Sequence, residues 1–184
     1  RTTVTVENYV DGVPSATDDR TLLYTYDGNG NTLSVKADLP SGQADQETAY
    51  IYGVTGDIYS NDLLAEVRYP DPTTGAASAS QKDVYTVNAL GETKTFTDRN
   101  GSVHTYSRDV LGRVFADAVT TLGNGVDGAV RRLETAFDTQ GNPYLFTSYD
   151  AASGGNIVNQ VKRDFNGLGQ LTADWQAHSG AVTG

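Results

Sequence analysis

The residues best suited to metal chemistry are Asp27, Asn29 and Asn31, which alternate with glycines in one short segment. Oxygen-bearing side chains at these places match the first, third and fifth positions of a calcium-binding loop. Such a loop also requires Gly at the sixth position and Glu at the twelfth, where this chain has Thr32 and Asp38. The residues that follow alternate as in a β-strand, so we interpret the segment as a hairpin turn and expect no metal site.

The other residues suited to catalysis are scattered along the chain. The two histidines, His104 and His178, lie at ligand spacing from neither a second His nor a cluster of carboxylates, and we expect both at the surface. Glu134 and Asp138 stand four residues apart in an expected strand, where they would share a face as solvated charges. No nucleophile elbow and no phosphate-binding glycine loop with Lys is present. The sequence therefore predicts no enzyme and no cofactor.

The composition narrows the class of protein further. A formal charge of −10 argues against nucleic acid as a partner, because its phosphates are neutralised by Lys and Arg. The chain has no Cys, which rules out disulfides and thiolate sites. A hydrophobic content of 38% predicts a folded chain, and no apolar run approaches the length of a membrane span. With no Met and no visible signal peptide, we expect an internal piece of a longer polypeptide.

The segment around Asp27 recurs along the chain. Its consensus is an aromatic or other residue, Asp or Asn, two free positions, Gly and a polar residue. Six copies begin at residues 26, 87, 97, 108, 137 and 165, and a weaker seventh covers residues 52–57, with Gly in the acidic position. The residues that define these repeat turns are Tyr26, Asp27, Gly30, Gly56, Asn88, Gly91, Asp98, Gly101, Asp109, Gly112, Phe137, Asp138, Gly141, Phe165, Asn166 and Gly169.

The chemistry of this repeat is that of a turn. Asp and Asn side chains bond to the backbone two residues on, and a Gly three positions later tolerates a positive φ. The flanking residues alternate as a pleated strand requires: Leu22, Tyr24 and Tyr26 share a face before the first turn, and Leu33 and Val35 share one after it. Each copy is therefore predicted to be a β-hairpin with one apolar face.

The spacing of the repeats predicts the domain organisation. Some repeat glycines lie 10 or 11 residues apart, which allows one strand per turn. Longer intervals contain inserts rich in Gly, Ser, Pro and Asp, which we interpret as surface loops near residues 38–47, 70–83, 120–129 and 150–156. Since a lone hairpin is barely stable, the units must stack to share a core. We predict an all-β chain: one array of antiparallel hairpins over residues 1–184, forming a twisted or spiralling sheet.

The repeat resembles the YD repeats of the RHS family, most clearly in the copies that begin at Tyr26, Arg108 and Phe165. That family includes bacterial polymorphic toxins, shell-forming components of insecticidal toxin complexes and the teneurin ectodomains. The resemblance implies a β-ribbon that spirals into a hollow shell, which encloses a C-terminal toxic domain or serves as an extracellular scaffold. Only Tyr26 and Tyr52 supply the Tyr of the motif. The Asp-Pro-Thr-Thr-Gly of residues 71–75 superficially resembles motifs near the self-cleaving junction of RHS toxins, but it lacks their surroundings and is interpreted as a loop.

We therefore expect a structural segment of a large extracellular or cell-surface protein, part of a shell or a fibre. Its partners would be the remaining repeats of the same protein and an encapsulated C-terminal effector, and exposed sheet edges would permit self-association. The alternative is an adhesion module that binds carbohydrate or another cell through exposed tyrosines, although aromatic rings also fill half-buried sheet faces. The tyrosines concerned are Tyr24, Tyr26, Tyr50, Tyr52, Tyr59, Tyr69, Tyr85, Tyr106, Tyr144 and Tyr149.

Overall fold

A computed structural model of the chain describes residues 2–6, 9–10, 13–14, 20–39, 42–53, 58 and 60–183. The described residues form β-strands, turns and loops and contain no helix, so none could cross a membrane as a helix. All the strand pairs are antiparallel, which confirms the predicted fold class. The chain divides into two compact units, Arg1–Glu92 and Thr93–Gly184.

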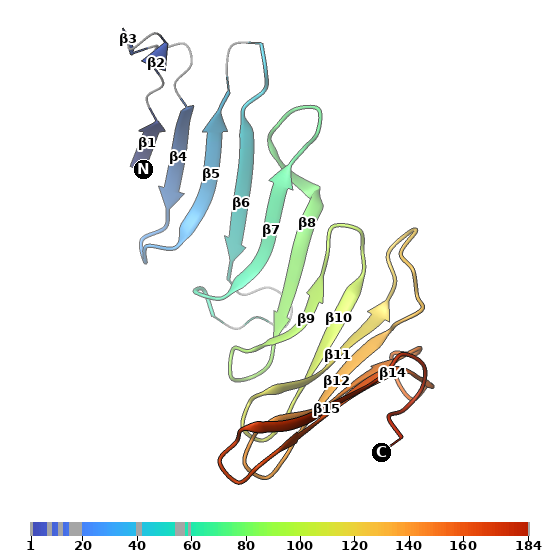
Figure 1. Ribbon diagram of the computed structural model, residues 1–184. Coiled ribbons are helices and arrows are strands. Elements are labelled where there is room, and N and C mark those ends of the chain that lie inside the picture. Colours follow the sequence, from blue (N-terminus) through green and yellow to red (C-terminus); the bar gives the residue numbers. More distant parts are fainter. Residues whose placement is uncertain are drawn as a thin grey trace. The chain divides into compact units, whose positions relative to one another are not determined.

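In the first unit, consecutive strands lie side by side in one sheet (Figure 1), in the order β1-β4-β5-β6-β7-β8. A short separate pair, β2 and β3, lies between β1 and β4 in the sequence. The bounds are β1 Thr2–Val6, β2 Tyr9–Val10, β3 Val13–Pro14, β4 Arg20–Tyr26, β5 Thr32–Asp38, β6 Gln46–Tyr52, β7 Leu64–Pro70 and β8 Ala77–Val87.

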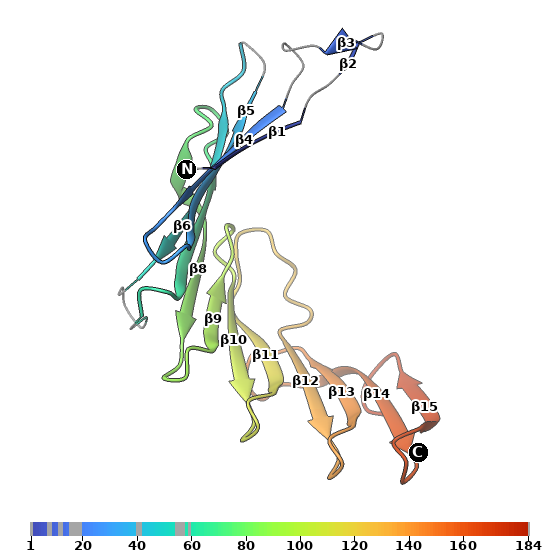
Figure 2. The same cartoon turned by 90° about the vertical axis from the view of Figure 1, so that its left-hand side faces the viewer.

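The second unit is an uninterrupted meander, in the order β9-β10-β11-β12-β13-β14-β15. The turns that join β10 to β11, β12 to β13 and β14 to β15 all lie at the same end of these strands (Figure 2). The bounds are β9 Thr93–Thr97, β10 Val103–Arg108, β11 Val114–Thr121, β12 Arg132–Phe137, β13 Pro143–Tyr149, β14 Ile157–Phe165 and β15 Leu171–Ala177.

The strand register agrees with the faces expected from the alternation. Leu22 pairs with Ala37 and Tyr24 with Val35, so the apolar residues of β4 and β5 lie on one face. A β-bulge follows, because the register shifts between Thr25 and Tyr26 at the end of β4. The hairpins β6–β7, β10–β11, β12–β13 and β14–β15 have a shift at the same place, next to the turn. Bulges at this place strengthen the local twist of each hairpin.

Few side chains are fully buried. A small cluster in the first unit combines Ile58, Ala65 and Val87, with Leu63 packed against it. Most strand residues are half-exposed on both faces; every residue of β6 is intermediate in burial, for example. The predicted sharing of a core between hairpins is thus achieved mainly by contacts between neighbouring side chains within each sheet.

The predicted bounds of one loop insert are wrong. The insert near residues 70–83 was interpreted as a loop, but the connection ends at Ala76 and residues 77–83 belong to β8. The alternation of Ala and Ser there lacks strong β-formers, and pairing with β7 supplies the stability instead. The Lys82 ammonium lies 2.6 Å from the Glu66 carboxylate, and the Tyr69 hydroxyl donates to Asp83 at 2.7 Å. Cross-strand pairs of this kind override a weak intrinsic propensity.

Candidate functional site

The repeat turns share one hydrogen-bonded geometry, which the Asp109 turn illustrates. The Asp109 amide donates to the Arg113 carbonyl at 3.0 Å, and the Gly112 amide donates to the Asp109 carbonyl at 3.0 Å. The Asp109 carboxylate then accepts from the amides of Leu111 and Arg113, at 2.9 and 3.0 Å. Gly112 has a φ of 80°, a left-handed conformation that costs Gly nothing and other residues about 1–2 kcal/mol.

Five further turns repeat this arrangement, with the first residue accepting from the amides two and four residues on. Their glycines all have positive φ, between 74° and 92° when Gly112 is included. Tyr26, Phe137 and Phe165 are the last residues of the strands that enter three of these turns. The weaker seventh copy, with Gly56, lies largely outside the described residues. The five turns are Asp27 with Gly30, Asn88 with Gly91, Asp98 with Gly101, Asp138 with Gly141, and Asn166 with Gly169.

The first and fifth residues of a turn are chemically matched, a feature that the sequence analysis missed. In three of the four Asp turns, the second carboxylate oxygen accepts from a donor side chain at the fifth position; in the Asp98 turn the Ser102 hydroxyl instead accepts from the Gly123 amide. Where the first residue is Asn, its amide donates to an acceptor at the fifth position. The Asp pairs are Asp27–Asn31 at 2.9 Å, Asp109–Arg113 at 2.7 Å and Asp138–Asn142 at 2.9 Å; the Asn pairs are Asn88–Glu92 at 2.7 Å and Asn166–Gln170 at 2.8 Å. The pairing is visible in the sequence once the fifth position is compared with the first.

These hydrogen bonds stabilise the ionised form of three turn aspartates, Asp27, Asp109 and Asp138. The hydrogen bond from the Asn31 side chain, with those from the backbone, lowers the pKa of Asp27, and Asn142 lowers that of Asp138 in the same way. For Asp109, desolvation raises the pKa, but the bonds from the Arg113 side chain and from the backbone outweigh it and the net pKa is lowered. The carboxylates of Asp27, Asp109 and Asp138 therefore act as acceptors for the backbone and are poorly suited to proton transfer.

The calcium-loop candidate is one of these turns. The two oxygens of Asp27 accept hydrogen bonds within the turn, while the Asn29 side chain donates to Asp62 at 2.9 Å. Its amide nitrogen, and not its oxygen, thus faces that carboxylate. In the part of the chain that the structure describes, no group of three or more His, Cys, Asp and Glu residues is placed to hold a metal ion.

His104 differs from the surface residue that was expected. It is half-buried, and its Nδ1 lies 2.8 Å from Oδ1 of Asp117 on the next strand. The rings of Phe96 and Tyr106 flank it at centroid distances of 6.1 and 6.4 Å. His178, by contrast, is exposed. The carboxylate partner of His104 is brought to it by the pairing of β10 with β11 and not by sequence spacing.

The other two acidic candidates serve separate purposes. Glu134 lies 2.8 Å from Nε of Arg132, while Asp138 caps its own turn. They are not brought together as an acid and a base. The Asp-Pro segment forms the turn between β7 and β8, where the Asp71 carboxylate accepts from the amides of Thr73 and Thr74, both at 2.9 Å. These backbone bonds lower the pKa of Asp71.

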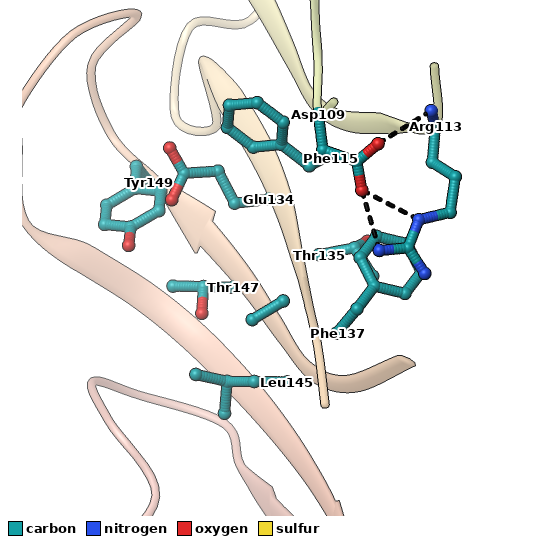
Figure 3. Close-up of a pocket in the computed structure, with 10 residues that line it drawn as sticks. Asp109, Arg113, Phe115, Glu134, Thr135, Phe137, Leu145, Thr147 and Tyr149 are labelled. Atoms are coloured by element: carbon teal, nitrogen blue, oxygen red, sulfur yellow. Dashed lines mark hydrogen bonds and ion pairs between the residues drawn. The ribbon is translucent and has the colours of Figure 1, made fainter. Parts of the chain in front are cut away.

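One cavity adjoins the Asp109 turn. It has a volume of about 350 Å³ and opens on β11, β12 and β13 (Figure 3). Arg113 forms part of its wall, paired with Asp109 and with its guanidinium 3.9 Å above the Phe137 ring. Glu134 and Tyr149 lie on the opposite side. The cavity thus combines aromatic rings with ion pairs whose charges cancel.

Among known proteins, the chain has similar solved structures but no matching family model and no matching curated sequence. Among solved structures, the chain is similar to one from the Tc holotoxin pore of Photorhabdus luminescens, with 12% identity, a TM-score of 0.28, and coverage of 95% of this chain and 11% of that one. It is also similar to TcdB2-TccC3, with 13% identity, a TM-score of 0.29, and coverage of 98% and 12%. The chain therefore spans about a ninth of these chains, and similarity at this level assigns no function.

Proposed function

We propose that this chain is a structural segment of a large RHS/YD-repeat protein, forming part of a shell or a surface fibre outside the cell. The observation that carries the proposal is the same capped turn in six copies, each joining successive strands of the chain. The sequence motif that resembles the YD repeat closes the β4–β5, β9–β10, β10–β11, β12–β13 and β14–β15 hairpins.

The geometry suits a scaffold because each turn is stabilised from within. The acceptor, the amides that it caps and the left-handed Gly all lie in five consecutive residues, as in Asp138–Asn142. Hairpins of this kind can be added one after another without a deep core, as in other repeat proteins. The carboxylates of Asp27, Asp109 and Asp138, whose pKa values are lowered, serve as turn caps, which favours a structural role over a catalytic one.

In this proposal the remaining repeats of the same polypeptide pair with the outer strands of the array. β15 has β14 as its neighbour on one side, and its other edge presents the backbone groups that a further strand would use. A shell built in this way would enclose an effector domain encoded elsewhere in the polypeptide.

Hydrogen exchange tests this arrangement. We would compare the isolated segment with the full-length protein, following the amides of β15 and, as an internal control, those of β13, which has a neighbour on both sides. The scaffold role predicts that outward-facing amides of β15 exchange markedly more slowly in the full-length protein, while β13 is unchanged. Equal exchange of β15 in both proteins would refute continuation of the sheet.

A second candidate function is adhesion through exposed tyrosines. Tyr26 has 41% of its surface exposed, and its ring is stacked on that of Tyr24 at 6.5 Å with an interplanar angle of 11°. An exposed, ordered aromatic face of this kind can stack on the apolar face of a sugar. A glycan array probed with the chain and with Tyr26→Ala tests the hypothesis: binding that the variant loses supports it, and an array without signal rejects it.

A further inference from the structure

The cavity on β11–β13 has the size of a small-ligand site. Its volume of about 350 Å³ falls within the range of pockets that bind small molecules. The wall comes from three adjacent strands, with Phe115 on β11, Glu134 on β12 and Tyr149 on β13. Three neighbouring paired strands are a firmer support than loops.

The two rings and the carboxylate line the same cavity. Figure 3 shows the Glu134 carboxylate between the rings of Phe115 and Tyr149. The guanidinium of Arg132 covers the Tyr149 ring at 3.9 Å, so this ring is fixed in place. Phe115 is 37% exposed although it is a large apolar residue, and it offers its ring to a ligand. Aromatic rings beside polar groups bind ligands that have both an apolar face and hydroxyl groups.

The charge balance of the cavity selects the class of ligand. Glu134 is paired with Arg132 at 2.8 Å, and Asp109 with Arg113 at 2.7 Å, so both carboxylates are compensated. Neither an anion nor a cation finds an excess of opposite charge here. The net charge of −10 on the chain further disfavours an anionic ligand. A carboxylate can accept several hydrogen bonds, which leaves capacity for hydroxyl donors beside the arginine.

The supporting side chains are already fixed. Thr147 is 5% exposed, and its hydroxyl accepts from Nε2 of Gln160 at 2.9 Å. Arg113 is held both by Asp109 and by the Phe137 ring, 3.9 Å away. A site whose groups are held in place before binding loses less conformational entropy when the ligand arrives.

We propose that this cavity binds one sugar residue of a neutral saccharide, with the apolar face of the sugar on Phe115 and neighbouring hydroxyls donating to Glu134. The inference goes beyond the second candidate function, because it assigns a saccharide site that does not include Tyr26, and it is independent of the scaffold role. It places the binding site in the second unit, at a position distinct from Tyr26.

The test uses the whole chain with two ligand sets: methyl glycosides of neutral hexoses by titration calorimetry, and an array of neutral and acidic glycans. Glu134→Gln is expected to weaken binding about tenfold, the usual contribution of a hydrogen bond to a charged group. Phe115→Leu removes the ring and should weaken it about fivefold, whereas Phe115→Tyr keeps the ring and should bind as the parent does. Urea unfolding of each variant verifies that it is folded.

Two control variants match the test variants in chemistry but lie elsewhere. Asp174→Asn neutralises an acid that is also paired with an arginine, Arg163, at 3.3 Å. Leu133→Ala alters the exposed apolar residue next to Glu134, on the other face of β12. Both should bind like the parent chain. Glycan binding that persists in the Glu134 and Phe115 variants overturns this site but not saccharide binding, whereas the absence of any binding overturns both. Binding restricted to acidic glycans overturns the neutral ligand.

Discussion

Several turn glycines of the first unit have a left-handed φ. Among them, Gly75 is the one whose replacement by Ala should destabilise this unit most. Gly75 has a φ of 72°, and an added Cβ would lie 2.0 Å from the Asp45 carbonyl oxygen. The Gly75 carbonyl also accepts from the Glu47 amide at 2.8 Å, so the β7–β8 turn and the strand β6 are in direct contact. The methyl group can be accommodated only if this backbone contact opens.

The magnitude follows from two separate costs. The left-handed conformation costs an Ala about 1–2 kcal/mol. Forcing a methyl group into backbone atoms adds about 1–3 kcal/mol, which gives a total of about 2–5 kcal/mol. Gly30, with a φ of 92° and no atom near an added Cβ, incurs only the first cost. Gly28 has neither a left-handed φ nor a close neighbour, and Gly28→Ala should remain within about 0.5 kcal/mol of the parent.

The assay is urea unfolding of the parent and the three variants, with the free energy of unfolding compared at a common m-value. The expected order of destabilisation is Gly75→Ala, then Gly30→Ala, then Gly28→Ala. Exchange of the Glu47 amide should also accelerate in Gly75→Ala alone, since its acceptor is displaced. If Gly75→Ala and Gly30→Ala lose the same free energy, the contact with Asp45 contributes nothing and the reasoning is refuted.

Further predictions concern the turn pairs. Asn88→Asp places a carboxylate against Glu92 and should lower the free energy of unfolding. The double variant Asn88→Asp/Glu92→Gln restores a donor opposite the carboxylate and should recover that free energy. A double variant no more stable than the single one would contradict the chemical matching of the first and fifth turn residues. Because the pKa values of Asp27 and Asp138 are lower in the folded chain, their contribution is present above about pH 4 and is lost as the pH falls below it. Acid titrations monitored by circular dichroism should therefore show a shallower loss of stability for Asp138→Asn than for the parent, and identical slopes would contradict this.

The features that the sequence predicted well are local ones. A turn such as Asp98–Gly101 is determined within five residues, because the acceptor side chain, the capped amides and the left-handed Gly are all contiguous. The N-terminal half of β8 was missed because its stability comes from β7. The pairing of Arg68 with Lys82, of Val67 with Asp83 and of Pro70 with Ala77 makes this polar segment a strand.

Contacts between distant residues depend on the register, which local chemistry does not determine. The pairing of His104 with Asp117 requires that β10 and β11 be aligned as they are, with shifts at both ends of β10. A slip of one residue would send the two side chains to opposite faces. No spacing rule in the sequence could have shown this pair.

The cavity shows most clearly that side-chain placement depends on the strand register. Ala116 pairs with Glu134, so simple alternation would direct the neighbouring Phe115 to the other face of the sheet. In the register of β10 with β11, however, Ser107 pairs with Ala116 and Arg108 with Val114, which leaves Phe115 as the extra residue of the bulge. A bulge re-aims the side chain that it carries, and Phe115 lines the cavity together with Glu134. A bulge also lies next to the repeat turn in the β4–β5, β12–β13 and β14–β15 hairpins. Among the hairpins that the structure describes, only β10–β11 places an exposed Phe on the extra position beside a paired Glu on the next strand. The bulge that twists this hairpin therefore also builds the wall of the proposed ligand site.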